Sequence, residues 1–130
     1  PTPICASKEA TDKNYDAAVL YMVEHIETMA IFAGTHNELS SYTLMNLMQE
    51  RGIKTNDNRI WFGQLYGMSD NISYNLAAHR YNVAKYLPFG PVKDVMPYLI
   101  RRAEENTSVA GQTSRELSML KAERSRRKSS

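Results

Sequence analysis

The stretch "RIWFGQL", residues 59–65, decides the fold because it is the clearest strand in the sequence. Aromatic and branched residues dominate it, and strands favour these residue types. A pattern typical of a helix precedes this stretch, and a second one follows it. Two other short apolar runs, at residues 28–34 and 82–87, stand at similar distances on either side. They predict two more strands.

Four amphipathic patterns predict helices between and around these strands, because apolar residues recur in them at the helical period. These helices are expected at residues 13–27, 35–52, 69–79 and 92–106. Thr11 or Asp12 can cap the first helix and Ser69 the third, since short polar side chains satisfy free backbone amides. Gly52 is expected to end the second helix.

The order of these elements predicts an α/β fold. Strands that alternate with helices lie parallel and are joined by right-handed crossovers. Such strands are buried on both faces, and the three runs read as nearly continuous apolar stretches. Three strands make a poor sheet alone, whereas a (βα)8 barrel takes about 250 residues. The sheet is therefore either small and open or completed by strands outside the chain.

Composition narrows the class of protein. The chain has 130 residues, of which 42% are apolar, as in a globular domain. A net charge of +2, with basic residues concentrated at 124–128, gives little support for a nucleic-acid partner. Cys5 is the single cysteine, which excludes an internal disulfide and fits a reducing compartment. The start lacks an initiator methionine and a signal-peptide pattern, so we expect a chain processed or excised from a longer one.

Polar residues follow the predicted strands, at the edge of the sheet where α/β folds bind ligands. They are Thr35, His36 and Asn37 after the first strand, Gln64 in the second and Tyr86 at the end of the third. Each has a structural alternative. Thr35, His36 and Asn37 could cap the next helix, Gln64 could be a satisfied core amide, and Tyr86 could be a core aromatic. One histidine without a second ligand at suitable spacing is weak evidence for a metal.

The most specific feature is the pair of adjacent arginines in "PYLIRRAEEN", residues 97–106. On a helix, Tyr98, Arg101, Arg102 and Glu105 lie on one face. The pair is either solvated surface charge or a fork that binds a carboxylate through parallel hydrogen bonds. Glu105 could hold that fork in place, and Tyr98 is either a core aromatic or a wall of the same site. No Gly-rich phosphate loop, nucleophile motif or zinc spacing accompanies them.

Three motifs together resemble the C-terminal part of proline dehydrogenase. They are "GTHN" at a strand end, "WFGQLYGMSD" and "KYLPFGPVKDVMPYLIRRAEEN", in that order, and the likeness runs from about Pro3 to about Arg115. The resemblance implies a distorted (βα)8 barrel that holds FAD and oxidises L-proline to pyrroline-5-carboxylate, with a membrane quinone as electron acceptor. Residues 1–113 would be the last three βα units of that barrel, and residues 114–130 a basic C-terminal helix or tail.

The resemblance also implies roles for individual residues. One group would bind the proline carboxylate or pack beside the proline ring: Arg101, Arg102, Tyr86, Tyr98 and Leu65. A second group would contact the flavin: Thr35, His36, Asn37 and Glu105. The family's catalytic lysine and aspartate, and its main flavin-binding arginine and glutamine, come from earlier strands. No catalytic residue is therefore predicted here, and we expect the isolated chain neither to hold FAD tightly nor to oxidise proline.

Two alternatives remain open beside the resemblance. The first is a carboxylate- or phosphate-binding protein on another α/β scaffold, which would use the same arginines without a flavin. The second is a nucleic-acid module that uses the basic tail, which the low net charge disfavours. Exposed strand edges invite pairing, so the isolated chain is expected to form a homo-oligomer. The whole enzyme is expected in the cytoplasm, peripheral to the inner membrane, or in the mitochondrion of a eukaryote.

Overall fold

The computed structural model describes residues 4–108, 117–118, 121 and 124–125, with the backbone alone at residues 103 and 105–108. The chain divides into two units, Pro1–Tyr86 and Leu87–Ser130, and each is described by itself. Among the described residues, no helix combines the length and the apolar composition needed to span a bilayer. The predicted tail at residues 114–130 lies mostly outside the described residues, so it and its boundary stay predictions.

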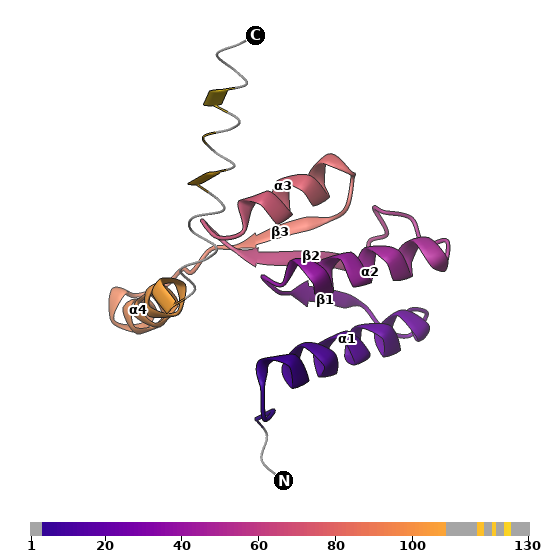
Figure 1. The fold of residues 1–130 in the computed structure, drawn as a ribbon, viewed down its shortest axis with the longest axis horizontal. Helices are drawn as coiled ribbons and strands as arrows, with labels where there is room; N and C mark the ends of the chain where they lie inside the picture. Colours follow the sequence, from indigo (N-terminus) through magenta and orange to yellow (C-terminus); the bar gives the residue numbers. More distant parts are fainter. Residues whose placement is uncertain (1–3, 109–116, 119–120, 122–123, 126–130) are drawn as a thin grey trace. The chain divides into compact units, whose positions relative to one another are not determined.

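The order of elements agrees with the prediction of one helix followed by three strand–helix pairs (Figure 1). The first unit contains α1 (Lys8–Glu24), β1 (Ile31–Gly34), α2 (Glu38–Glu50), β2 (Ile60–Leu65), α3 (Asp70–Ala78) and β3 (Val83–Tyr86). The second unit contains α4 (Val92–Ser108). The strands form one parallel sheet in the order β1-β2-β3, so consecutive βα units lie side by side.

The two faces of this sheet differ, and here the expectation of strands buried on both faces is wrong. Ile31, Ala33, Ile60 and Phe62 alternate along β1 and β2 and are all buried. Phe32, which points to the other face, is 62% exposed. The physical reason is that helices of the first unit cover one face only, so we call the other the open face.

One hydrophobic core fills the space between the covered face and the helices α1, α2 and α3. Besides the four buried strand residues, its buried members are Val19, Val23, Ile26, Leu44, Met48, Ile72 and Leu76. Leu44 and Phe62 have no exposed surface. Each buried side chain of this size contributes about 1.5–3 kcal/mol to folding, so this core holds the covered face and its helices together.

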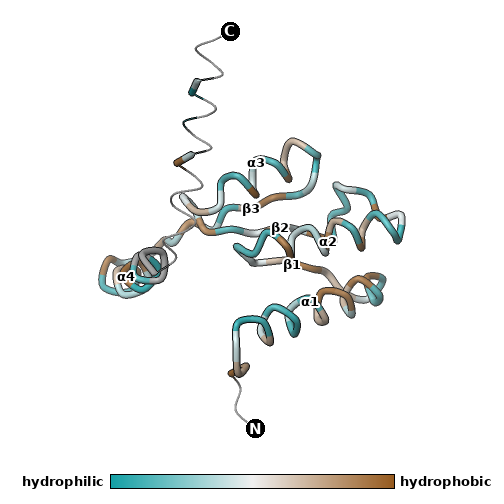
Figure 2. Tube along the Cα trace, viewed as in Figure 1, coloured by the Kyte–Doolittle hydropathy of each residue, from teal (hydrophilic) through white to brown (hydrophobic). Residues whose placement is uncertain are grey.

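Helix α1 begins five residues before its predicted start, and neither Thr11 nor Asp12 caps it. Its N-cap is Ser7, whose Oγ accepts a hydrogen bond from the backbone amide of Ala10 at 3.2 Å. The first half of α1 is hydrophilic and only its second half is hydrophobic (Figure 2). Hydrophobic periodicity therefore could not detect the solvent-exposed first turns.

Candidate functional site

The carboxyl ends of β2 and β3 bring two predicted substrate residues together. Leu65 and Tyr86 are register partners in the parallel ladder. By strand alternation both lie on the open face, two residues along from Gly63 and Ala84. Tyr86 is 54% exposed and Leu65 is partly buried. This pairing provides an apolar wall and a phenol at the edge of the sheet where α/β proteins bind ligands.

Glycines keep this part of the open face shallow. Gly34, at the end of β1, and Gly63, two residues before the end of β2, are register partners. A Cβ atom built on Gly34 meets no atom within 4 Å, which leaves open space above that strand end. A Cβ on Gly63 would lie 2.3 Å from Cε1 of Phe32, so the Phe32 ring covers this glycine directly. The open face is therefore unobstructed at Gly34 and covered by the Phe32 ring at Gly63.

The turn after β1 has structural partners of its own. Asn37 is the N-cap of α2, and its Oδ1 accepts from the Leu39 amide at 3.0 Å. The Oγ1 of Thr35 accepts from the Asn37 amide at 3.0 Å. The capping interpretation is thus confirmed for Asn37, while Thr35 braces the turn. Flavin contact by either residue stays a prediction.

His36 lies in the same turn but contacts the next βα unit. Its Nδ1 lies 2.8 Å from Oγ of Ser69, and its Nε2 accepts from the backbone amide of Leu65 at 3.5 Å. The ring is therefore bonded both to the end of β2 and to the start of α3. No group of three or more His, Cys, Asp and Glu side chains suited to a metal occurs in the described part of the chain.

Ser69 takes the predicted N-cap position of α3 but does not cap it with its side chain. Its backbone is in the left-handed region, with φ 51° and ψ 43°. Its hydroxyl is directed at His36 instead, as the 2.8 Å distance shows. The prediction of the position was right and that of the side-chain role was wrong, because a long-range partner replaced the local one.

Gln64 is a satisfied core amide, which was one of the two interpretations of this residue. It is 2% exposed. Its Nε2 donates to the carbonyl of Thr35 at 3.3 Å, and its Oε1 accepts from Oγ of Ser73 at 2.9 Å. A buried amide with both ends bonded stabilises the carboxyl edge of the sheet and has no need of a ligand.

Lys85 is a residue of this region that the sequence analysis did not identify. Its Nζ donates to the carbonyl of Met68 at 2.6 Å and lies 2.7 Å from Oδ1 of Asp70. It thereby ties β3 to the loop that follows Leu65. A charged residue inside the apolar strand "VAKY" was the available signal, since a strand rarely places a lysine without a partner.

The arginine pair lies in the second unit, on α4. The Arg102 guanidinium lies 5.5 Å from the ring centroid of Tyr98, which confirms that these two residues share a helix face. Such a contact is typical of a cation–π interaction. Arg101 is exposed and Arg102 is partly buried. The side chain of Glu105 lies outside the described residues, so its predicted contact with the pair stays a prediction.

A second ion-pair group lies at the opposite end of β2, where Arg59 precedes the strand. Its guanidinium bonds both carboxylate oxygens of Asp57, at 3.0 and 2.8 Å, and Oε1 of Glu27 at 3.1 Å. These bonds, with the Arg59 backbone amide, lower the pKa of Asp57 to about 2. They raise the pKa of Arg59. This group joins the turn after α1 to the loop before β2, and we interpret its role as structural.

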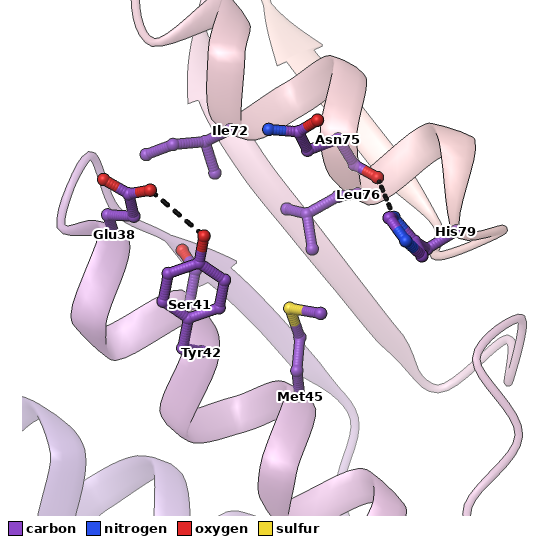
Figure 3. Close-up of a pocket in the computed structure, with 8 residues that line it drawn as sticks. All are labelled: Glu38, Ser41, Tyr42, Met45, Ile72, Asn75, Leu76 and His79. Atoms are coloured by element: carbon purple, nitrogen blue, oxygen red, sulfur yellow. Dashed lines mark hydrogen bonds between the residues drawn. The ribbon is translucent and has the colours of Figure 1, made fainter.

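A pocket of about 280 Å³ opens between α2 and α3 (Figure 3). Its lining is Glu38, Ser41, Tyr42, Met45, Ile72, Asn75, Leu76 and His79. The hydroxyl of Tyr42 donates to Glu38 at 3.1 Å at one end, and Nδ1 of His79 lies 2.8 Å from the Asn75 carbonyl at the other. None of the predicted site residues lines this pocket.

Comparisons with known proteins agree with the sequence motifs. The family model described as "Proline dehydrogenase" matches residues 1–115. The chain is 40% identical to "Carbapenem antibiotics biosynthesis protein CarD" of Pectobacterium carotovorum subsp. carotovorum, over 94% of this chain and 31% of that protein. It is 41% identical to "Proline dehydrogenase 1, mitochondrial" of Homo sapiens, over 96% of this chain and 21% of that protein.

A solved structure supports the fold. The crystal structure of proline utilization A (PutA) from Bdellovibrio bacteriovorus inactivated by N-propargylglycine matches with a TM-score of 0.75 and 29% identity. The match covers 84% of this chain and 11% of that one. The predicted fold class, parallel strands with flanking helices that form part of an α/β barrel, is confirmed. The chain spans less than a third of the two curated relatives named above, and it belongs to the proline dehydrogenase family.

Proposed function

We propose that this chain is part of an FAD-dependent proline dehydrogenase that oxidises L-proline to pyrroline-5-carboxylate and passes the electrons to a quinone. The observation that carries the proposal is the Leu65–Tyr86 pair on the open face, in a chain of this family. The pair offers a proline ring an apolar neighbour and an aromatic one. The isolated chain is expected to be inactive, because it spans only part of the relatives it matches.

The residues of the first unit fit a flavin at the carboxyl edge of the sheet. Gly34 leaves open space at its strand end, and the adjacent turn carries Thr35, His36 and Asn37. Thr35 and Asn37 already bond within the turn, so their contribution would be a rigid surface. Bound FAD would accept the hydride, and the protein would supply orientation and exclude water.

The residues of α4 would hold the substrate's carboxylate. A guanidinium fork binds a carboxylate in one plane, which fixes the amino acid as well as attracting it. Arg101 and Arg102 would form that clamp, with Tyr98 steadying Arg102 through the ring contact. Glu105 is proposed to lie near both the arginine pair and the flavin. Fixing the proline ring in this way would hold proline and FAD in the orientation that hydride transfer needs.

The proposal is tested by replacing the matching segment of proline dehydrogenase 1 of Homo sapiens with this chain and measuring proline oxidation with an artificial electron acceptor. We expect a flavin-containing, active chimaera. Arg101→Ala in that chimaera should raise the KM for proline by roughly 30- to 5,000-fold, since losing one partner of a desolvated charge pair costs about 2–5 kcal/mol. Arg51→Ala is the matched control, because Arg51 pairs with Glu24 on the protein surface.

A chimaera that folds and holds FAD yet oxidises no proline would contradict the proposal. Binding of carboxylates or phosphate by the chimaera in the absence of flavin would favour the alternative, a binding protein without a cofactor. Steep loss of binding to DNA or RNA with rising salt would favour the nucleic-acid module. The three outcomes are separate, because each is measured with a different ligand.

Partners and location follow from the same proposal. Proline dehydrogenase 1 of Homo sapiens and of Caenorhabditis elegans are named as mitochondrial. We propose a mitochondrial location if the source is a eukaryote and otherwise the cytoplasm, with the whole enzyme peripheral to the inner membrane. In the isolated chain, β1 and β3 end the sheet and can pair with a second copy. Light scattering during size-exclusion chromatography tests this, and a monomer at all concentrations would refute the homo-oligomer.

A further inference from the structure

A network of hydrogen bonds joins the turn after β1 to β2 and to the start of α3. Gln64 Nε2 donates to the Thr35 carbonyl at 3.3 Å, and Ser73 Oγ donates to Gln64 Oε1 at 2.9 Å. The Ser69 carbonyl lies 3.2 Å from Ser73 Oγ and shares its single proton. Ser69 Oγ lies 2.8 Å from Nδ1 of His36, which follows Thr35 in the chain.

Three side chains of this network are buried. Gln64 is 2% exposed, Ser73 is 3% exposed and Ser69 is 6% exposed. Hydrogen bonds in such an environment are strengthened by the low local dielectric, and breaking one leaves a polar atom without water. The side chains at positions 64, 69 and 73 therefore hold one arrangement together. Of the residues in this network, His36 is the one whose ring lies at the carboxyl edge of the sheet.

The partners of His36 select one tautomer. The backbone amide of Leu65 can only donate, so Nε2 of His36 has to accept. In a neutral imidazole the other nitrogen then carries the proton, so Nδ1–H donates to Oγ of Ser69. Nε2 faces the backbone amide of Leu65, whose side chain lies beside Tyr86 on the open face. In this tautomer the protonated nitrogen points to Ser69, away from that pair.

The backbone of Ser69 has a conformation that is unfavourable for serine. Its φ of 51° is in the left-handed region, which a serine adopts less readily than glycine. Its side chain does not compensate by capping α3. Glycine would fit this backbone better, so the hydroxyl is what serine adds at this position. The contact that the hydroxyl makes is the one with His36.

We propose that Ser69 is a positioning residue that sets the plane of the His36 ring, by accepting from Nδ1–H of the tautomer that the Leu65 amide selects. The significance of this role rests on the proposed function, in which His36 contacts the flavin. Ser69 itself touches neither substrate nor cofactor in this proposal and acts through His36. It holds the ring with its Nδ1 proton directed to the start of α3.

The test is nuclear magnetic resonance of the His36 ring nitrogens in the 130-residue chain without flavin, which reports the tautomer directly. We expect the Nδ1–H form in the wild type. Ser69→Gly should keep the Nδ1–H form, because the Leu65 amide remains, but should accelerate exchange of the Nδ1 proton with water by about fivefold, the size that one lost hydrogen bond supports. Ser69→Thr retains the hydroxyl and should retain the slow exchange of this proton. Ser41→Ala is the matched control, because Ser41 is equally buried but bonds the Asn37 carbonyl.

The melting temperature distinguishes a positioning role of Ser69 from a merely structural one. Glycine relieves the left-handed backbone, whereas threonine strains it further. We therefore expect Ser69→Gly to melt close to the wild-type temperature, because relief of the backbone offsets the lost hydrogen bond, and yet to exchange the Nδ1 proton faster. Ser69→Thr should melt lower and exchange this proton slowly. An Nε2–H tautomer in the wild type, or unchanged exchange of the Nδ1 proton in Ser69→Gly, would overturn the proposal. The readout needs no flavin, so failure of the proposed function would instead appear as an inactive chimaera.

Discussion

Gly52 and Arg80 occupy the same position at the ends of α2 and α3, and both have left-handed backbones, with φ of 65° and 64°. In each case the amide of the next residue bonds a carbonyl in the last turn, Ile53 to Met48 at 2.8 Å and Tyr81 to Leu76 at 3.0 Å. This is the Schellman ending, in which glycine is usual. The predicted helix end at Gly52 is confirmed, and Arg80 adopts the same backbone conformation at the end of α3.

Arg80→Gly is expected to raise the free energy of unfolding by about 0.5–1 kcal/mol. Relief of left-handed strain, about 1–2 kcal/mol, exceeds the entropy cost of glycine, about 0.5–1 kcal/mol. Urea unfolding with an unchanged slope measures the difference. Gly52→Ala is the opposite control and should destabilise, because a Cβ there meets no atom within 4 Å and only the backbone is strained. A lower midpoint for Arg80→Gly would contradict this account.

The two phenylalanines Phe62 and Phe32 test which face of the sheet carries the core. Phe62→Ala should lower the free energy of unfolding by about 3–5 kcal/mol, because the ring has no exposed surface. Phe32→Ala should cost less than about 1 kcal/mol, since its ring is 62% exposed. Both values come from urea unfolding at the same protein concentration. Similar losses for the two variants, growing with protein concentration, would show instead that a second copy covers the open face.

Lys85→Met should loosen the loop that follows Leu65. The variant keeps most of the aliphatic stem but loses the bonds to the Met68 carbonyl and to Asp70. The carbonyl then lacks this partner, so we expect a loss of about 1–3 kcal/mol in the free energy of unfolding. Hydrogen exchange should also accelerate at residues 66–70. Lys13→Met, at an exposed lysine of α1, is the control and should change neither quantity.

Asp57 predicts a specific loss of stability in acid. Its pKa in the folded chain is about 2, below the ordinary value of 3.8, because Arg59 bonds the carboxylate. Because folding lowers this pKa, the ionised Asp57 carboxylate stabilises the folded chain fully above pH 3.8. This stabilisation is lost as the pH falls from there through about 2. Wild type should therefore exceed Asp57→Asn in unfolding midpoint at pH 7, and the gap should close towards pH 2. A gap that is constant with pH would refute the assignment.

The sequence by itself determined the order of elements, the parallel sheet and the family. These follow from local patterns: strand residues in "RIWFGQL", helical periodicity between the strands, and motifs such as "GTHN". The cap at Asn37 and the stop at Gly52 were also predictable, since each depends on atoms within a few residues. Hydrogen bonds between residues a few positions apart can be predicted from the sequence, because both partners lie in the same short stretch.

Only the tertiary structure decided which face of the sheet is open, that Ser69 bonds His36, and that Lys85 ties β3 to the loop before α3. His36 and Ser69 are 33 residues apart, and no periodicity relates them. The apolar pattern of β1 and β2 is the same on both faces, so it could not reveal that the helices of the first unit cover one face only. Long-range contacts arise from how the βα units pack, and packing brings together side chains whose separation in the sequence carries no information about their distance.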